Sequence, residues 1–472
     1  MPDTDTTSVS GALDRISINA FHRRLLAVCG TAWAFDGMEV ILISFTLPVL
    51  LDAWGLSGPA AGLLGSASLM GMIVGNWGWG YAADRYGRKP AFQWTVLTYA
   101  VFAGLTALAV GFYTGFALRF LTGVGLGGAL AVDTSYLSEH LPTDRRGRYL
   151  VYLDAFWPLG YGFAVAIAWL FLSYLPSGGT VSIPVFGAVA GWRLLFVASA
   201  IPGLLVFAVR YGLSETPYYL ARAGKIEAAN ERLRAIAAES GEEYEPITID
   251  EVESRESAGV RDLFAADLRA RTITIALAWF AINFGYYGVF IWLPQTFGAS
   301  GTVPALHLGG ATFGGVYGYF LLIALVQFPG YASAAYLVER VGRKRTLGTY
   351  LLASGVFTFV FASAMPGAGF GLGVSGFWPF FVALLASSFF TLGAWGAIYA
   401  YTPELFPTEL RATGNGFAGG VGKIAAVVGP VLAGALVPAG YVVALLPLAV
   451  AFGLGGAIVL AFGVETMGTP LG

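Results

Sequence analysis

The chain contains 472 residues, of which 57% are hydrophobic and only 11% are charged. Soluble domains carry about 25% charged residues, so the composition excludes an ordinary soluble protein. The net charge of −2 argues against a nucleic-acid-binding protein. One cysteine excludes an internal disulfide, and one cysteine with three histidines offers no metal cluster, so we expect no metal and no cofactor. The first 24 residues are polar and lack the features of a cleaved signal.

Twelve segments are apolar over the roughly 20 residues that a transmembrane helix needs. In chain order they lie near residues 25–51, 59–83, 91–111, 115–138, 150–173, 190–212, 272–297, 313–337, 347–366, 376–402, 414–437 and 440–463. Helices satisfy their own backbone hydrogen bonds, which lipid cannot do, whereas the short alternating segments of a membrane β-barrel are not seen in the sequence. The sequence therefore predicts an all-α membrane protein with twelve transmembrane helices.

Lysine and arginine predict the orientation, because they are retained on the cytoplasmic side. All but three of the 26 lie in the N-terminal tail or in the segments that follow even-numbered spans. Loops after odd-numbered spans, such as PSGGTVSIPVFGAVAG, contain none. We therefore expect both termini in the cytoplasm, in an inner or plasma membrane. Of the three exceptions, Arg193 is an interfacial anchor beside Trp192, whereas Arg119 and Lys423 lie within apolar spans.

One long polar segment, residues 213–271, separates six spans from six. The predicted organisation is an N-terminal tail (1–24), a six-helix bundle (25–212), a cytoplasmic linker with short amphipathic helices (213–271), a second six-helix bundle (272–463) and a C-terminal tail (464–472). In the linker, AANERLRAIAAE places Leu233, Ile236 and Ala237 on one helix face. The run EEYEPITIDEVESRE is expected to be a loop.

The two halves carry matching sequences. ADRYGRK, from Ala83, corresponds to VERVGRK, from Val338, and YLSEHLPTDRR, from Tyr136, corresponds to YTPELFPTELR, from Tyr401. A duplication of six spans with a central linker predicts two pseudo-symmetric bundles. It is the plan of secondary transporters, in which the solute site lies near the membrane midplane between the repeats.

The stretch GYAADRYGRK, from Gly80, resembles the signature of the major facilitator superfamily for the loop between the second and third helices. The resemblance implies a cytoplasmic gate in which Asp84 pairs with Arg88 and holds the outward-open state shut at the inner side. The alternative is that these basic loops only set the topology. The residues assigned to the gate are Gly80, Asp84, Arg85, Gly87, Arg88, Glu139, Arg146, Glu215, Glu339, Arg340, Arg343, Glu404 and Arg411.

The stretch RFLTGVGLGG, from Arg119, is similar to the fourth-helix motif of the same superfamily. It also matches the GxGxxG pattern of dinucleotide sites, but that pattern requires a turn between a strand and a helix. Here it lies within a predicted spanning helix, where small residues allow close helix packing. We therefore predict no dinucleotide site.

Several stretches resemble the nicotinate permease and synaptic vesicle glycoprotein 2 branch of the superfamily. They are FDGMEV in the first span, SYLSEH in the fourth, NFGYYGVFIWLP in the seventh and SETPYYLARAGKIEAA after the sixth. The chain departs from sugar porters at Tyr218, where they have arginine, and it lacks their paired glutamines in the seventh span. The resemblance implies a nicotinate-like aromatic carboxylate as the first candidate solute.

Two acids, Asp36 and Glu39, lie near the middle of the first span, three residues apart and thus on one helix face. Charge at the bilayer centre costs at least about 2.5–3.5 kcal/mol per residue. A carboxylate that takes up and releases a proton is what a proton-coupled carrier needs. We therefore expect Asp36 and Glu39 to couple protons or to coordinate the solute; a structural pair satisfied by hydroxyls or by Lys423 is the alternative.

Further polar and aromatic residues lie within the spans. Lys423 or Arg119 is expected to meet a solute carboxylate, and Lys423 could instead pair with an acid across the cavity or reach toward the cytoplasmic side. Asp133 and Asp154 are counted among the residues expected to couple protons or to bind the solute; they would line the inner vestibule or bridge to Arg145, Arg146 or Arg148. The residues expected to line the solute site are Asn283, Tyr286, Tyr287, Trp157, Tyr161, Trp395 and Tyr399, several of which could equally be core or interfacial rings.

These observations predict a monomeric secondary transporter that moves a small organic solute with protons by alternating access. A carrier for a sugar, a polyol or an organic cation is one alternative, because four intramembrane acids outnumber two bases. A membrane receptor built on the carrier fold is an alternative of another class. The sequence contains no nucleophile–base motif and no phosphate loop, so we predict that it is not an enzyme.

Overall fold

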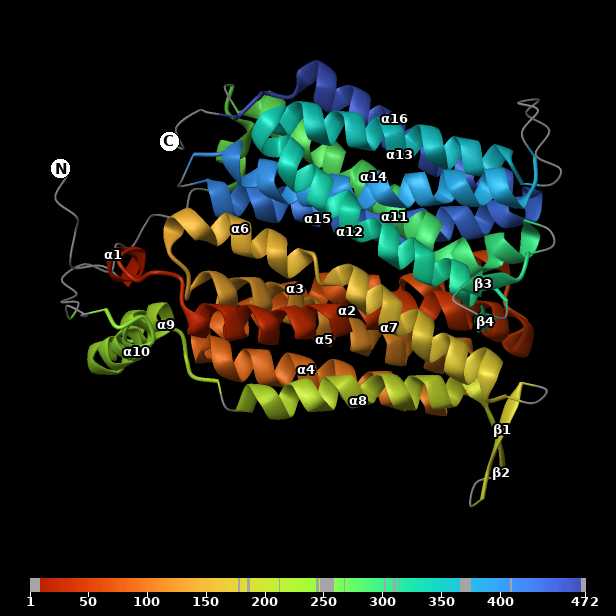
Figure 1. Cartoon of the computed structure of the whole chain (residues 1–472), viewed down its shortest axis with the longest axis horizontal. Coiled ribbons are helices and arrows are strands. Elements are labelled where there is room, and N and C mark those ends of the chain that lie inside the picture. The colour runs from red at the N-terminus through yellow and green to blue at the C-terminus, as the bar shows by residue number, and fades with distance from the viewer. Residues whose placement is uncertain are drawn as a thin grey trace.

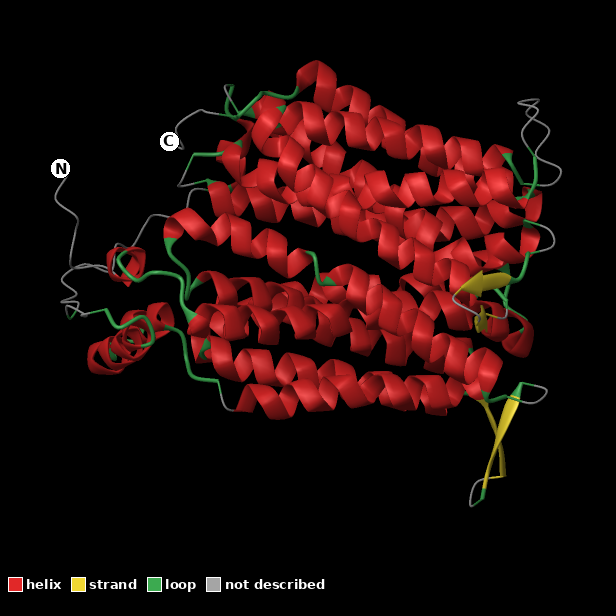
Figure 2. Cartoon of the chain, viewed as in Figure 1, coloured by secondary structure: helices red, strands yellow, loops and turns green. Residues whose placement is uncertain are grey.

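The computed structural model describes residues 9–467 except 177–178, 185–186, 212, 243–245, 247–258, 267, 301–302, 309–310, 314, 366–374 and 408–409. Nearly all of this part of the chain is helical (Figure 2). Two short antiparallel hairpins are the exceptions among the described residues, β1 (Thr180–Ile183) with β2 (Gly187–Ala190) and β3 (Leu306–Leu308) with β4 (Ala311–Phe313). Most of the acidic run predicted as a loop lies outside the described residues.

The helices form two groups of six spans (Figure 1). The first half comprises α2 (Ala20–Trp54), α3 (Gly58–Tyr86), α4 (Arg88–Leu105) continued by η1 (Thr106–Leu108), α5 (Phe112–Ser138), α6 (Thr143–Asp154) with α7 (Trp157–Trp169) and η2 (Leu170–Tyr174), and α8 (Gly191–Tyr211). The second half comprises α11 (Arg269–Ala299), α12 (Tyr317–Arg340), α13 (Arg343–Ser363), α14 (Phe377–Glu404), α15 (Arg411–Leu436) with η4 (Val437–Ala439), and α16 (Tyr441–Phe462).

The predicted number of spans is confirmed. Within the described residues, 11 helical segments are long and apolar enough to cross a membrane. The twelfth span is α8, whose apolar stretch Gly191–Leu204 is shorter. The boundaries differ most at the fifth span, which begins at Thr143 rather than near residue 150 because the polar first turns of α6 continue the same helix.

Both termini lie at one end of the bundle, together with α1 (Val9–Asp14), α9 (Pro217–Arg222) and α10 (Ile226–Ala238), and the two hairpins lie at the other (Figure 1). We call these the termini end and the hairpin end. The order of spans alternates between them, as the predicted topology requires.

The two halves touch at the hairpin end along α3 and α15. A Cβ added to Gly58 would lie 2.1 Å from the carbonyl oxygen of Gly434. Further along α3, the Ser66 hydroxyl donates to the Val427 carbonyl at 3.2 Å. Toward the termini end the same two helices part, because a Cβ on Gly80 of α3 would meet nothing within 4 Å.

Other residues in the same part of the two helices agree with this divergence. Trp77 of α3 is 82% exposed, and a Cβ added to Gly416 or Gly419 of α15 would likewise have no neighbour within 4 Å. The halves are therefore closed against each other at the hairpin end and apart at the termini end along this pair of helices.

Glycines set the close packing within each half. A Cβ on Gly71 of α3 would lie 2.0 Å from the carbonyl oxygen of Phe120 in α5, and one on Gly123 of α5 would lie 2.0 Å from that of Ser68. Because no larger residue fits at these crossings, the RFLTGVGLGG stretch serves helix packing, as the sequence predicted.

The fifth span is broken between α6 and α7. Pro158 has no N–H with which to bond the carbonyl of Asp154, four residues earlier. The chain instead tightens, and the Phe156 amide bonds the Leu153 carbonyl at 3.1 Å. Asp154 therefore ends one helix and Trp157 begins the next.

The segment predicted as an N-terminal tail contains α1 and the first turn of α2, which Asn19 caps. Helix α1 packs with the linker helices α9 and α10 through one apolar cluster, which includes Leu13 and the α10 residues Leu233, Ile236 and Ala237. Asp14 at the end of α1 accepts from the amide and hydroxyl of Thr143 at 2.6 and 3.1 Å. The short helix η3 (Val260–Phe264) precedes α11.

Gly160→Ala tests the packing of α2 on α7. The added Cβ would lie 1.9 Å from the Ala34 carbonyl oxygen, so the helices must separate, at a cost of about 1–3 kcal/mol. We expect a lower unfolding temperature for the purified protein in detergent. Gly162→Ala, in the same helix but with nothing within 4 Å, is the control and should be neutral or slightly stabilising. Equal stability of the two variants would contradict this account.

Candidate functional site

The break in the fifth span places polar side chains at the junction of the two halves. The indole Nε1 of Trp157 donates to the hydroxyl of Tyr286 in α11 at 3.0 Å. Both side chains are buried. The two residues, which the sequence proposed separately for the solute site, therefore join one half to the other near the middle of the spans.

Around this hydrogen bond the structure collects an aromatic cluster from both halves, consisting of Trp157, Tyr161, Trp279, Tyr286, Tyr287, Trp395 and Tyr399. The ring centroid of Tyr286 lies 5.1 Å from that of Tyr287 and 5.9 Å from that of Trp395. Trp279 lies 5.7 Å from Trp395 and 5.2 Å from Tyr399. Tyr161 reaches the cluster through Phe290, at 5.9 Å.

The cluster is closed on most sides. Tyr399 is 41% exposed and forms its open edge, whereas the indole Nε1 of Trp395 is buried without a hydrogen-bond partner among the described residues. A buried donor of this kind normally has a partner. Sequence reasoning missed Trp279, although its position four residues before Asn283 puts both on one face of α11.

Asn283 and Gly422 are neighbours across α11 and α15. A Cβ on Gly422 would lie 2.6 Å from Nδ2 of Asn283, and Lys423 is the next residue of α15. The same nitrogen donates a hydrogen bond to the Trp279 carbonyl at 2.9 Å. The side-chain oxygen of Asn283 is left available as an acceptor. Lys423 is partly exposed and forms no ion pair within the described residues, so the expected pairing with an acid across the halves is not seen.

The acids of the first span are buried, but they do not act as an isolated pair. Nη1 of Arg119 lies 3.2 Å from Oε2 of Glu39, and both side chains are fully buried. Nη2 of Arg119 donates to the Glu39 carbonyl at 2.7 Å, and the guanidinium lies 5.4 Å from the Phe196 ring centre. Asp36 is also buried, one turn away on α2. The sequence identified all three residues but not the pairing of Glu39 with Arg119.

The other two acids of this half are buried as well. Asp133 lies within α5, and Asp154 at the end of α6 lies near the Tyr331 hydroxyl of α12 and the Trp33 indole of α2. No bridge from Asp154 to Arg145, Arg146 or Arg148 occurs in the described part of the chain. Arg145 instead pairs with Asp144 at 3.0 Å, because both point to the surface. Tyr331 was missed by the sequence analysis.

The predicted gate residues of the first half form one charge cluster at the termini end. Arg88 lies 2.9 Å from Asp84 and 2.9 Å from Glu139. Glu215 accepts from the amide of Arg88 at 3.1 Å and from that of Lys89 at 3.2 Å. Gly87 precedes them with φ 109°, which favours glycine. Burial raises the pKa of Glu215 despite these backbone donors.

The second half repeats this cluster. Arg343 lies 3.2 Å from Glu339 and 3.0 Å from Glu404, and Gly342 has φ 107°. The place of Glu215 is taken by Glu465, which accepts from the Arg343 amide at 2.8 Å. Sequence reasoning missed Glu465, although a Glu-Thr dipeptide follows the last span of each half.

The threonines of these dipeptides complete the symmetry. Thr216 donates to Glu139 at 2.5 Å and Thr466 donates to Glu404 at 2.6 Å. Each cluster lies within its own half. In this arrangement the pairing of Asp84 with Arg88 therefore does not join the halves.

The remaining predicted gate residues lie at helix ends near these clusters. Arg85 donates to the Tyr81 hydroxyl and Arg340 covers the Tyr336 ring. Arg146 and Arg411 donate to the carbonyls of Leu141 and Pro403, at 3.3 and 3.1 Å. These four arginines therefore anchor helix ends at the termini end rather than linking the two halves.

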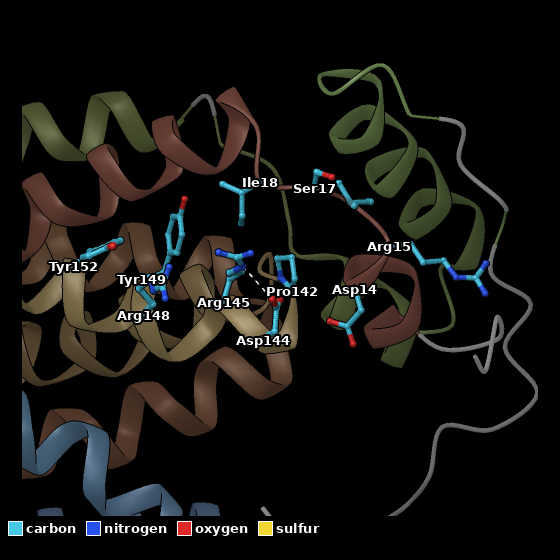
Figure 3. Close-up of a pocket in the computed structure, with 11 residues that line it drawn as sticks. Asp14, Arg15, Ser17, Ile18, Pro142, Asp144, Arg145, Arg148, Tyr149 and Tyr152 are labelled. Carbon is cyan, nitrogen blue, oxygen red and sulfur yellow. Dashed lines mark hydrogen bonds and ion pairs between the residues drawn. The ribbon is translucent and has the colours of Figure 1, made fainter. Parts of the chain in front are cut away.

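A pocket of about 530 Å³ lies at the termini end between α1 and α6 (Figure 3). Arg145, Arg148 and Tyr149 line it from α6, and Asp14 lines it from α1. It contains none of the residues predicted to bind the solute. A second pocket of about 310 Å³ lies at the charge cluster, lined by Asp84, Arg88 and Glu139 among others. Neither pocket reaches the aromatic cluster, so we assign the solute to neither.

Arg119→Met tests the buried ion pair. It leaves the Glu39 carboxylate buried without its cation, and removal of one partner of a buried pair costs about 3–5 kcal/mol. We expect a correspondingly lower unfolding free energy in detergent, and much of it should return in Glu39→Met/Arg119→Met. Arg145→Met, in the half-exposed pair with Asp144, is the control and should cost at most about 1 kcal/mol. Additive losses in the double variant would contradict the pairing.

Comparisons with known proteins agree with this architecture. The niacin transporter NiaP of Acinetobacter baylyi is 32% identical over 89% of this chain and 88% of its own length. The synaptic vesicle 2-related protein of Xenopus laevis is 29% identical over 92% of this chain and 76% of its own. The xylose transporter XylE of E. coli, in a partially occluded inward open conformation, superimposes with a TM-score of 0.72 over 96% of this chain and all of its own, at 17% identity, and shows the fold.

The family model of the sugar (and other) transporters matches residues 42–472. That family and the solved structures are those of transporters, so the prediction that the chain is not an enzyme is confirmed. The chain is therefore a multi-pass membrane transporter that belongs to the sugar (and other) transporter family, and its fold is that of the major facilitator superfamily.

Proposed function

We propose that the protein carries a small aromatic carboxylate, with nicotinate as the first candidate, together with protons by alternating access. The observation that carries the proposal is the aromatic cluster at the junction of the halves. Helix α15 adds Lys423, which follows the Gly422 that contacts Asn283 and Trp279 and forms no ion pair in the described residues. The similarity to niacin transporters supports the solute class. Flat rings are suited to stack among such side chains, with a few polar groups fixing their orientation.

Lys423 is the better of the two cations for the solute carboxylate. Arg119 is fully buried and already neutralised by Glu39. Lys423 is partly exposed and forms no ion pair within the described residues. The unpaired indole N–H of Trp395 offers a second donor on the edge of the cluster. One cation and one neutral donor suit a carboxylate or a ring nitrogen acceptor.

Alternating access is supported by the contrast between the two ends. The halves are closed at the hairpin end and apart at the termini end along α3 and α15. With the termini in the cytoplasm, as the lysine and arginine distribution predicts, this arrangement is inward-facing. Each half keeps its own charge cluster, so the halves are able to move as units about the junction.

Proton coupling is assigned to Asp36 and Glu39. Protonation of Glu39 would break its ion pair with Arg119. Asp36 is the nearest other acid along the same helix. A proton gradient would then drive the solute inward from an acidic exterior.

An organic cation is the second candidate solute. The first half buries Asp36, Glu39, Asp133 and Asp154 against one buried arginine, and an excess of acids beside aromatic rings suits a cation. Transport of the cation without transport of nicotinate would favour this candidate. Binding without transport of either would favour a receptor built on the same fold.

The proposal is tested by uptake of labelled nicotinate into proteoliposomes, with and without an acid-outside pH gradient. Gradient-dependent accumulation that collapses with an uncoupler is expected. Uptake that equilibrates but never accumulates would remove the proton coupling, and absence of uptake in both conditions would remove nicotinate.

Lys423→Met should lower the affinity of the transporter for nicotinate. Loss of a charge-assisted hydrogen bond of about 1.5–3 kcal/mol raises the half-saturation concentration by at least about tenfold. Ile424→Met, at the exposed neighbouring position, is the control. Lys423→Arg should retain most of the affinity. An unchanged half-saturation concentration in Lys423→Met would exclude this residue as the carboxylate ligand.

Asp36→Asn should uncouple transport from protons. We expect loss of gradient-driven accumulation, because the amide cannot exchange a proton, with nicotinate exchange across the membrane retained. Asp52→Asn, an exposed acid near the end of the same helix, is the matched control. Full gradient-driven uptake by Asp36→Asn would exclude Asp36 as the proton carrier.

A further inference from the structure

Asp154 occupies an unusual position among the buried acids, because it lies where the two halves meet. It ends α6, three residues before Trp157, whose indole bonds Tyr286 of the other half. Asp154 is 7% exposed. The carboxylate is close enough to interact electrostatically with four tyrosine hydroxyls on three helices of the second half. They are Tyr286 and Tyr287 of α11, Tyr331 of α12 and Tyr399 of α14.

The surroundings of Asp154 contain no counter-charge. From its own half it meets the neutral indole of Trp33 on α2, and from the second half only phenols. No lysine, arginine or second acid among the described residues acts on it. Its Oδ2 atom has no hydrogen-bond partner in the described part of the chain, and neither does Nε1 of Trp33. Glu39 differs, because Arg119 of the same half neutralises it.

An ionised carboxylate in such a place costs free energy, because water is removed and no cation replaces it. Binding a proton removes this cost, and so does a movement of the halves that returns water to the carboxylate. The two events are therefore linked: the arrangement of the halves that buries Asp154 binds a proton there more tightly than an arrangement that hydrates it.

We propose that Asp154 is a second proton-binding site, separate from Glu39 and Arg119, and that its protonation stabilises the arrangement of the halves that is closed at the hairpin end. Tyr331 is a positioning residue in this inference, because its hydroxyl faces the carboxylate across the junction. The inference rests on the proposed alternating access but not on the identity of the solute.

Two partly exposed tyrosines lie on the elements that surround Asp154. Tyr152, two residues before Asp154 on α6, is 46% exposed, and Tyr399 of α14 is 41% exposed. No group is transferred other than the proton, which moves between the carboxylate and solvent.

The experiment measures how pH changes the opening of the hairpin end. In a Cys29→Ala background, which removes the single cysteine, Ser66→Cys places a thiol in the buried contact with Val427. An impermeant maleimide reports exposure of this thiol between about pH 8 and about pH 5.5, a range in which a desolvated carboxyl titrates. Val110→Cys, 78% exposed at the hairpin end, corrects for the reactivity of the thiol itself. No solute is added.

When Asp154 is present, lowering the pH should slow maleimide labelling of Ser66→Cys several-fold relative to labelling of Val110→Cys. Adding Asp154→Asn, which resembles the protonated acid, should keep the thiol protected at every pH. Adding Asp52→Asn, an exposed acid at the hairpin end, should leave the profile of the parent unchanged. A parent without pH dependence, or an Asp154→Asn variant with the dependence of the parent, would overturn the inference.

Tyr331→Phe keeps the inference testable if Asp154→Asn fails to fold, as judged by size-exclusion chromatography. Loss of the hydroxyl removes a polar group near the ionised carboxylate and leaves an apolar ring there, so Asp154 should bind its proton more tightly and protection of the thiol should persist to higher pH than in the parent. An unchanged profile in a folded Tyr331→Phe variant would then overturn the inference. Because the assay needs no solute, pH-dependent protection without nicotinate uptake would reject the proposed solute and retain this site.

Discussion

A charged side chain inside a membrane-spanning bundle has no water to solvate it, and the rest of this structure depends on how that cost is met. Glu39 and Arg119 meet it by pairing within the first half. Lys423 in the second half has no ion pair in the described residues, and Asp154 faces neutral hydroxyls across the junction. Glu39 and Arg119 are therefore neutralised inside one half, whereas the charges of Lys423 and Asp154 depend on what lies between the halves.

Among the described residues, most of the strong polar contacts stay within one half, as the proposed alternating access requires. Arg88 and Arg343 each hold two acids of their own half at the termini end. Glycine crossings bring helices of one half together at distances that no larger residue allows. Between the halves the polar contacts are few, such as the bond from Trp157 to Tyr286 and that from Ser66 to the Val427 carbonyl. Such a junction suits the proposed alternating access, because breaking these contacts leaves the contacts within each half in place.

The candidate site was predictable in its members but not in its pairings. The sequence identified Arg119 and Glu39 separately, because each is a charge in an apolar span. Their contact joins residues 80 positions apart, and no local pattern encodes it. Trp279 and Tyr331 were missed because an aromatic residue in an apolar span is usually core. Glu465 was missed because it lies in the short C-terminal tail, although the Glu-Thr dipeptide repeats that of Glu215.

The twelve spans, the duplication and the family were all predictable from the order of residues, because hydrophobic length, charge distribution and repeated motifs are properties of the chain read in order. Only the tertiary structure decided that Glu39 is neutralised by Arg119, that Lys423 is left without a counter-ion in the described residues, and that Asp154 lies at the junction. The physical reason is that a buried charge takes its behaviour from the groups packed against it, and those groups come from helices distant in sequence.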